Sequence, residues 1–215
     1  MTEIIKIDPN DATYEDLAPA ADILLSGGLI AGPTQSFYAL MALADKPDAL
    51  ERISDLKPGR MPERAFLLLI DQKRRSQSYA MEVSKEADAL MDKFWPGLLT
   101  LLMPGHTGLH HLLLGKSKTV GLRVEGLAST RRLIRMVDRG ITGTSANPHL
   151  SQPPTTVEEV MAYFPEQIDL ILDAGPTAGG LSSTIVDLAG PVPWIFRQGA
   201  IAVEDIATVC PSISS

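Results

Sequence analysis

The stretch LKPGRMPERAFLLLI, residues 56–70, decides the fold class. Pro58, Gly59 and Pro62 stop the helical pattern that precedes them, and the unbroken apolar run 65–70 follows closely. An apolar run without polar alternation is typical of a strand that is covered on both faces. The stretch therefore predicts a helix, a stiff loop and a buried strand in succession.

The same alternation of helices and strands extends outward in both directions. Ser84 and Asp45 are expected N-caps, and Thr155 and Glu158 have capping-box spacing. Helices are expected at about 17–25, 45–56, 84–94, 129–138, 155–163 and from 203, and strands at 29–32, 65–70, 98–103, 119–124, 169–173, 183–188 and 194–196. The segment 140–145 is expected to be a strand followed by a turn. This order indicates an α/β fold, a mixed sheet of parallel and antiparallel strands flanked by helices, and the lack of a linker-like segment favours a single domain.

The composition restricts the partners that the chain can have. Its 215 residues carry a net charge of -7, so no broad attraction to nucleic acid or to an anionic membrane is expected. No run approaches the roughly 18 apolar residues of a membrane span, and no signal-peptide pattern begins the chain. Cys210 is the single cysteine, which excludes an internal disulfide. We expect a cytoplasmic protein, without membrane contact, that gathers cations locally to hold any anion.

Several familiar site motifs are incomplete. The GKS at 115–117 lacks the P-loop glycine, whose position is taken by His110. His106 and the pair His110 and His111 are not completed by a Cys, a second His cluster or an HExxH pattern, so no metal site built from protein side chains is expected. Neither G-x-S-x-G nor G-x-G-x-x-G occurs, which leaves a serine-hydrolase elbow and a dinucleotide fold without support.

Hydroxyl, amide and arginine side chains recur where predicted strands end. Thr34 follows the strand 29–32, Ser145 and Asn147 lie in a turn after another strand, and Arg197 follows 194–196. In open α/β sheets, ligands bind at such strand ends. Ordinary turn chemistry or a solvated strand end is the alternative interpretation of the same residues.

Three cations, Lys57, Arg60 and Arg64, stand in the loop of the opening stretch. Two interpretations are open: the cations are solvated side chains of a loop between a helix and a strand, or they form a clamp for a polyphosphate. Arginine offers planar, forked donors to phosphate, and lysine offers a compact charge. Because the flanking prolines and glycine end the helix, we predict that the loop displays these cations to a ligand.

Seven segments resemble, in order, the signatures of the YrdC/Sua5/YciO family. They are GGLIAGPTQSFYAL, LKPGRMPERAFLLLI, FWPGLLTLL, VGLRV, GTSANPHLSQPPTT, GLSSTIVDL and WIFRQGAI. The resemblance covers residues 10–205, and it implies a YrdC-like domain with a twisted mixed sheet and a concave ligand face. The chain looks like the short, single-domain form, without the second domain of Sua5-type proteins.

The resemblance also implies an activity, the synthesis of L-threonylcarbamoyladenylate. The implied enzyme is a nucleotidyltransferase that uses L-threonine, bicarbonate and ATP with Mg²⁺ and releases pyrophosphate. Its product feeds the threonylcarbamoylation of adenosine 37 (t6A37) in tRNA, so tRNA and downstream t6A transferase proteins are implied partners. A monomer or a homodimer is expected. No catalytic residue is implied beyond those that position the substrates.

The resemblance assigns binding roles by position. The implied ATP contacts are Lys57, Arg60, Ser145, Asn147 and Arg197. The implied threonine contacts are Thr34, Arg123 and Ser183. Arg64 stands where a second basic residue usually follows and is interpreted as a phosphate or RNA contact.

Two departures from the family pattern support an alternative. Lys57-Pro58-Gly59-Arg60 is one residue longer than the usual Lys-x-Arg, and Tyr38-Ala39-Leu40 replaces the usual Tyr-Gly-Leu. The alternative is a YciO-like protein that binds double-stranded RNA, tRNA or a nucleotide without synthase activity. A third interpretation, carbamoyl-adenylate chemistry on another acceptor as in hydrogenase-maturation relatives, uses further domains.

Overall fold

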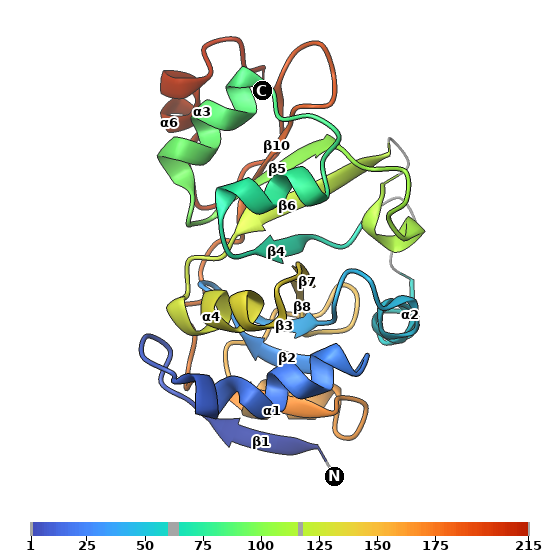
Figure 1. Ribbon diagram of the computed structural model, residues 1–215. Coiled ribbons are helices and arrows are strands. Elements are labelled where there is room, and N and C mark those ends of the chain that lie inside the picture. Colours follow the sequence, from blue (N-terminus) through green and yellow to red (C-terminus); the bar gives the residue numbers. More distant parts are fainter. Residues whose placement is uncertain (1, 60–64, 116–117, 215) are drawn as a thin grey trace.

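The computed structural model describes residues 2–59, 65–115 and 118–214, and in these ranges the strands form two sheets (Figure 1). The five-stranded sheet has the order β1 (Glu3–Lys6), β9 (Leu170–Asp173), β2 (Ile30–Pro33), β3 (Tyr38–Met41) and β8 (Thr144–Ser145). The six-stranded sheet has the order β11 (Trp194–Arg197), β10 (Thr184–Asp187), β5 (Leu99–Pro104), β6 (Thr119–Val124), β4 (Leu68–Ile70) and β7 (Ile141–Thr142). The two sheets lie one above the other in Figure 1, with the N-terminus beside the lower sheet and the C-terminus beside the upper one.

Both sheets mix parallel and antiparallel pairs. In the five-stranded sheet β9 runs parallel to β1 and β2, whereas β3 is antiparallel to β2 and β8. In the six-stranded sheet β10 is parallel to β5 and β4 is parallel to β6, and the other neighbours are antiparallel. The predicted α/β class, with a mixed sheet flanked by helices, is confirmed.

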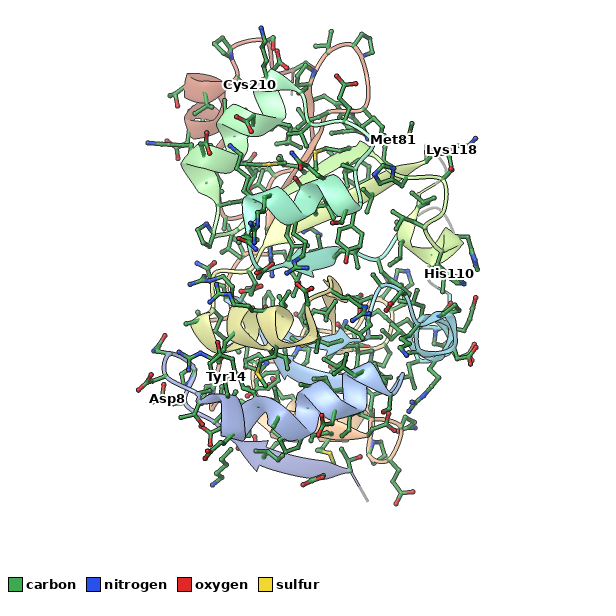
Figure 2. All side chains as sticks on the ribbon, viewed as in Figure 1. Asp8, Tyr14, Met81, His110, Lys118 and Cys210 are labelled. Atoms are coloured by element: carbon green, nitrogen blue, oxygen red, sulfur yellow. The ribbon has the colours of Figure 1, made fainter. Side chains whose placement is uncertain are left out.

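The helices cover the sheets in separate groups. α1 (Tyr14–Leu25) and α4 (Ala128–Val137) pack together in front of β2 and β3, and α3 (Lys85–Phe94) packs with α6 (Val203–Val209) at the other end (Figure 1). α2 (Pro47–Asp55) contacts the short helix η2 (His111–Leu113), and His110 lies beside this contact (Figure 2). The remaining helices are η1 (Lys73–Ser78) and α5 (Val157–Tyr163). None of the helices in the described ranges is long and apolar enough to cross a membrane.

Local capping explains where several helices begin. The Ser84 hydroxyl accepts the Ala87 N–H at 3.1 Å, which confirms the predicted start of α3. The capping box of α5 is Thr156 with Glu159, one residue later than predicted, because the Glu159 carboxylate accepts the Thr156 N–H.

Other features of the secondary structure differ from the prediction. The strand expected over 65–70 covers only Leu68–Ile70, and the segment 140–145 contains two short strands, β7 and β8, divided at Gly143. The N-cap of α2 is Lys46 rather than Asp45, and the Asp45 carboxylate instead accepts a hydrogen bond from Arg139 at 2.8 Å. The strands β1 and β3 were not expected as separate elements. β1 is a short edge strand with a charged residue at each end, and β3 returns along β2 after the tight turn 34–37.

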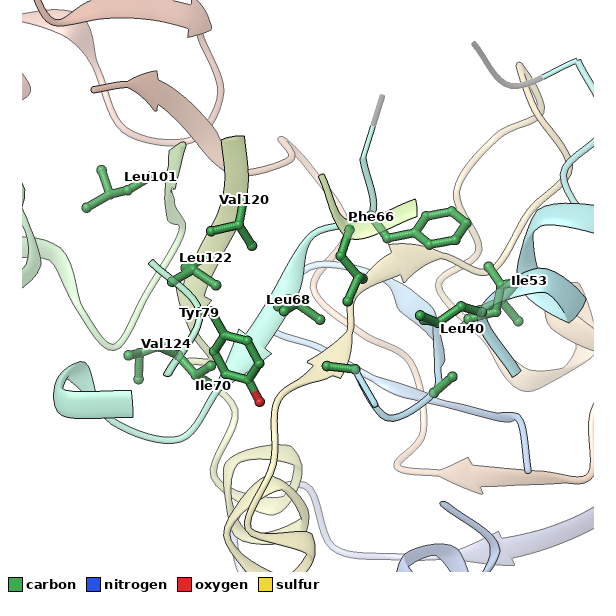
Figure 3. Close-up of a cluster of buried hydrophobic side chains, with 14 of the residues drawn as sticks. Leu40, Ile53, Phe66, Leu68, Ile70, Tyr79, Leu101, Val120, Leu122 and Val124 are labelled. Atoms are coloured by element: carbon green, nitrogen blue, oxygen red, sulfur yellow. The ribbon is translucent and has the colours of Figure 1, made fainter. Parts of the chain in front are cut away.

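One hydrophobic cluster extends through both sheets. It includes Leu40 of β3, Ile53 of α2, Leu68 of β4 and Leu122 of β6, all of them fully buried (Figure 3). A second cluster fills the space under α1 and α4, where Leu17 and the α4 side chains pack on the five-stranded sheet. Because the first cluster is continuous, the two sheets share a core.

Residues 141–145 join the two sheets covalently, since β7 pairs with β4 and β8 pairs with β3. The fully buried Thr142 hydroxyl donates to Leu40 O and accepts from the Ala42 N–H, both at 3.0 Å. Gly143 lies between the two strands, where an added Cβ would come within 2.6 Å of the Leu69 side chain. The chain can pass from one sheet to the other here because the Thr142 hydroxyl bonds to the backbone of residues 40–42 and Gly143 leaves room for the Leu69 side chain.

Replacing Thr142 by valine tests this junction. Valine has nearly the same shape but leaves the Leu40 carbonyl and the Ala42 N–H without their side-chain partner. We expect Thr142→Val to lower the free energy of unfolding by about 1–3 kcal/mol in urea denaturation. Thr107→Val, at an exposed position, is the matched control. Equal stability of the two variants would contradict the account.

Candidate functional site

A cavity of about 550 Å³ lies where the two sheets meet. The five-stranded sheet contributes the turn between β2 and β3 and the end of β8, and the six-stranded sheet contributes β5, β6, β10 and β11. Lys57, Arg123 and Arg197 are among the lining residues, so a chain with a net charge of -7 gathers cations here. Such a local concentration of positive charge suits an anionic ligand.

Seven of the predicted site residues line this one cavity. They are Thr34, Lys57, Arg123, Ser145, Asn147, Ser183 and Arg197. The other two predicted contacts, Arg60 and Arg64, lie outside the described residues. The fold thus brings together side chains that are far apart in the sequence.

The sequence predicts that Lys57 is displayed to a ligand. In the structure its side chain is turned inward, and only 4% of the residue is exposed. Its Nζ donates to Ser145 O at 2.7 Å and to Asn147 O at 2.5 Å. These carbonyls stand at the end of β8, where they need donors in the interior of the protein. Lys57 therefore fixes the Ser-x-Asn turn and leaves its charge in the cavity wall.

Asn147 presents an unused acceptor. Its Nδ2 donates to Pro148 O at 3.0 Å and to Ser151 O at 2.7 Å, which determines how the amide is turned. Its Oδ1 is buried and accepts no hydrogen bond in the part of the chain that the structure describes. Since a buried acceptor without a donor is costly, this atom is suited to receive an N–H or O–H group of a ligand.

A buried ion pair orients Arg123. Its Nη2 donates to Glu125 Oε2 at 2.5 Å, and both side chains are buried. Glu125 Oε1 accepts the N–H groups of Gln35 at 2.9 Å and Leu127 at 3.0 Å, which joins the β2–β3 turn to the start of α4. The buried Arg123 Nε makes no hydrogen bond to any described residue. An oriented guanidinium with a spare donor is suited to bind a carboxylate.

Ser183 and Arg197 form a second polar group on the wall of the cavity. The Ser183 hydroxyl lies 2.8 Å from the Thr100 hydroxyl, and Arg197 Nη2 donates to Ser183 O at 2.9 Å. Ser183 is buried, whereas Arg197 is exposed at the edge strand β11. Arg197 can therefore meet a ligand that extends toward solvent.

The hydroxyl of Thr34 is used within its own turn. It donates to Phe37 O at 2.7 Å and accepts the Phe37 N–H at 3.3 Å. The Thr34 hydroxyl is predicted to contact a substrate, and its hydrogen bonds show that it also shapes the turn. That turn brings Ser36, which was not predicted, to the cavity.

Tyr38 anchors the segment that follows β9 and contains Gly175, Gly179 and Gly180. Its hydroxyl donates to Gly175 O at 2.8 Å and accepts the Ala174 N–H at 3.1 Å. Burial, reinforced by the nearby carboxylates of Asp173 and Glu158, raises the pKa of Tyr38 to about 12 against the opposing effect of the Ala174 amide. The phenol stays protonated at neutral pH and acts as an anchor rather than as a base.

Ala39, which stands where the family usually has glycine, fits its place without backbone strain. It lies in β3 opposite Gly32 and Ser145. Its φ angle is not among the positive values found for non-glycine residues. Ala39 therefore borders the cavity with an ordinary strand backbone, and it belongs to the hydrophobic cluster under α1 and α4.

Several cavity residues were missed by the sequence analysis. Thr100, Thr119 and Asp187 line the cavity from strands that were predicted only as apolar runs. Asp187 is the one carboxylate among the described lining residues, and one carboxylate together with phosphate oxygens is a common way to hold Mg²⁺. The sequence offers a weak signal for such residues, namely a polar side chain within a strand that is otherwise apolar.

The fold and the cavity define a class: α/β proteins with two joined mixed sheets and a polar, cation-lined cavity between them. The Sua5_yciO_yrdC family model, described as telomere recombination, matches residues 22–199. The chain belongs to this family, which confirms the resemblance noted in the sequence.

Individual relatives agree with this assignment. Over 194 residues the chain is 32% identical to the threonylcarbamoyl-AMP synthase of Pyrococcus abyssi, covering 90% of this chain and 57% of that protein. The chain thus spans less than two thirds of that relative. The structure of P. abyssi Sua5 complexed with L-threonine matches with a TM-score of 0.92 at 31% identity, over 99% of this chain and 63% of the other. E. coli YciO matches with a TM-score of 0.87 at 27% identity, over 96% of this chain and 100% of YciO.

The inward position of Lys57 changes what its removal should do. A displayed cation could be removed with little loss of stability, but removing Lys57 would take a charged donor from two carbonyls. We expect Lys57→Ala to lower the free energy of unfolding by about 1–3 kcal/mol in urea denaturation. Lys93→Ala, on the exposed face of α3, is the matched control. A Lys57→Ala protein as stable as this control would show that the buried hydrogen bonds are unimportant.

Glu125 provides a second test of the site. Glutamine at this position keeps the size of the side chain but removes the negative charge beside Arg123. We expect Glu125→Gln to cost about 3 kcal/mol of stability, because it leaves a buried guanidinium uncompensated. Asp45→Asn breaks the half-exposed pair with Arg139 and should cost less than about 1 kcal/mol. The interpretation is wrong if thermal or urea unfolding shows equal losses.

Proposed function

We propose that the cavity binds ATP and L-threonine side by side and that the chain acts as a threonylcarbamoyl-AMP synthase. The observation that carries the proposal is the convergence of phosphate-type and carboxylate-type contacts, Lys57, Arg197 and Arg123, in one cavity. The P. abyssi relative, named a threonylcarbamoyl-AMP synthase, supports the same activity. The cavity volume of about 550 Å³ is in the range of ordinary small-molecule sites.

The nucleotide is assigned to the side of the cavity formed by the Ser145–Asn147 turn and Arg197. Asn147 Oδ1 would accept a donor from the base or the ribose, since it has no other donor among the described residues. Arg197, exposed at the end of β11, would meet the phosphates, and Lys57 would contribute its charge from behind the turn. Arg60 and Arg64 remain predicted phosphate contacts.

Threonine is assigned to the side formed by Arg123 and Ser183. The Arg123 Nε is a buried donor that is suited to a carboxylate, and Glu125 holds the guanidinium in place. The P. abyssi Sua5 structure, which matches this chain over 99% of its length, was determined with L-threonine. Thr34 supports the site through the turn that it shapes, together with Ser36 at the cavity wall.

The chemistry proposed for these substrates requires positioning and charge stabilisation. The threonine amine takes up bicarbonate, with loss of water, to give a carbamate. A carbamate oxygen then attacks the α-phosphorus of ATP, and pyrophosphate leaves. Negative charge grows on the phosphate oxygens in this step, and the lysine and arginine side chains would stabilise it. Asp187 is the described cavity residue suited to contact the Mg²⁺ that accompanies ATP.

The YciO-like alternative has one specific observation in its favour, the match over the whole length of E. coli YciO. A protein of this kind would bind a nucleotide or RNA without forming an adenylate. The net charge of -7 disfavours a broad RNA-binding face. tRNA and a t6A transferase protein remain predicted partners of the synthase.

Product analysis separates the two functions. The chain is incubated with MgATP, bicarbonate and each amino acid in turn, and the adenylate is detected by mass. We expect threonylcarbamoyl-AMP and pyrophosphate with L-threonine. Nucleotide binding without any adenylate would overturn the synthase proposal in favour of the YciO-like alternative.

Variants at Arg197 test the nucleotide side directly. Arg197→Ala should weaken ATP binding about tenfold or more in calorimetry, because a charge-assisted contact to phosphate is lost. Arg74→Ala removes an exposed arginine of η1 that does not line the cavity and is the matched control. The assignment fails if both variants bind ATP as the unmodified chain does.

A further inference from the structure

The contact between α2 and η2 brings together three potential metal ligands that were not expected from the sequence. They are Glu51 of α2 and the neighbours His110 and His111 at the start of η2. Figure 2 shows His110 next to α2, at the side of the molecule. None of the three is among the residues that line the cavity described above. The group is therefore separate from the proposed substrate site.

The spacing of the three groups resembles that of a metal ligand set. His110 Nε2 lies 3.6 Å and His111 Nε2 lies 3.7 Å from the same atom, Glu51 Oε1. One ligand atom from each residue can be chosen so that all three lie within 4.8 Å of one another. Around a tetrahedral Zn²⁺ ion with bonds of about 2.0–2.1 Å, ligand atoms are separated by about 3.4 Å. The two histidine–glutamate separations are within a few tenths of an ångström of that value.

Direct hydrogen bonding does not explain this arrangement. Separations of 3.6 and 3.7 Å are too long for N–H···O hydrogen bonds. The two imidazole rings lie 4.4 Å apart between centroids and are tilted by 43°, so they are not stacked face to face either. The two imidazole nitrogens therefore face the same carboxylate oxygen without a hydrogen bond to it, at distances that only a protonated histidine would make an ion pair.

We propose that Glu51, His110 and His111 form a binding site for a divalent transition-metal ion of the Zn²⁺ type. Two imidazoles and one carboxylate favour such an ion over Mg²⁺, which prefers oxygen ligands. The side chains of His111 and Glu51 are 72% and 50% exposed, so an ion can enter from solvent and a water molecule can complete its coordination.

Binding requires one small local change. The His110 Nδ1 accepts the Leu112 N–H at 3.4 Å, whereas a neutral imidazole that binds a metal through Nε2 carries its proton on Nδ1. This contact would be lost, and at 3.4 Å it is weak. The backbone of η2 is also held by the Phe66 N–H, which donates to Leu112 O at 2.7 Å, so the ligands remain in place.

The ion would connect two segments that pack against each other, α2 and η2. Glu51 lies in the middle of α2, and Lys57 follows shortly after the end of this helix. A metal bridge from Glu51 to η2 would thus stabilise the helix that precedes Lys57, whose Nζ donates to the carbonyls of Ser145 and Asn147. Because the ion binds the folded chain, it should raise the midpoint of thermal unfolding.

Metal titration of the whole chain tests the site. The protein is first treated with a chelator and dialysed, and ZnCl₂ is then titrated in competition with a chromogenic chelator in the presence of millimolar Mg²⁺. We expect one equivalent of Zn²⁺ to bind. His111→Ala and Glu51→Gln should weaken binding by about tenfold or more, since even outer-shell changes at metal sites reach this size. Both residues are exposed, so their replacement should leave the fold intact.

His106→Ala is the matched control, because His106 is an exposed histidine near η2 that does not belong to the group. It should bind Zn²⁺ like the unmodified chain and should keep the zinc-dependent rise in the unfolding midpoint. The proposal is overturned if the unmodified chain binds no Zn²⁺ or if Mg²⁺ displaces it. Equal loss in His106→Ala and His111→Ala would also overturn it.

Discussion

The passage of the chain between its two sheets is the constraint on which the site depends. Thr142 satisfies the backbone of β3 with its hydroxyl, and Gly143 leaves room for Leu69. Two residues later the same segment presents Ser145 and Asn147 to the cavity. The element that joins the sheets therefore also positions part of the ligand wall, so the geometry of the site follows from the geometry of the junction.

A second constraint is the placement of charge. The chain is acidic overall, yet Lys57, Arg123 and Arg197 face one cavity. Two of these cations are buried, and each has a specific partner: backbone carbonyls for Lys57 and the Glu125 carboxylate for Arg123. Burial of a charge is tolerated only with such partners, and the partners then fix the direction in which the charge acts. The described part of the site is in this sense already organised before a ligand binds.

Local signals in the sequence were sufficient for much of the fold. The Pro58–Gly59 break and the Ser84 cap are found where they were predicted, because each depends on neighbouring residues, and the apolar run 65–70 contains the shorter strand β4. The direction of Lys57 could not be predicted in this way. Its partners, Ser145 O and Asn147 O, are 88 and 90 residues away.

Glu125 shows the same limit of sequence-based prediction. Glu125 accepts the N–H groups of Gln35 and Leu127. These two amides come together only when the β2–β3 turn and the start of α4 have formed. The group of Glu51, His110 and His111 was missed for a related reason. Its histidines were recognised as a pair, but the third ligand comes from a helix that only the folded chain brings near.

The central claim is that one cavity between the two sheets holds a nucleoside triphosphate beside an amino acid. A crystal structure of the chain with a non-hydrolysable ATP analogue and L-threonine tests it most directly. The account predicts the phosphates near Arg197, the threonine carboxylate near Arg123, and both ligands in the cavity that Lys57 and Asn147 line. Ligands bound elsewhere on the molecule, with this cavity filled only by water, would contradict it.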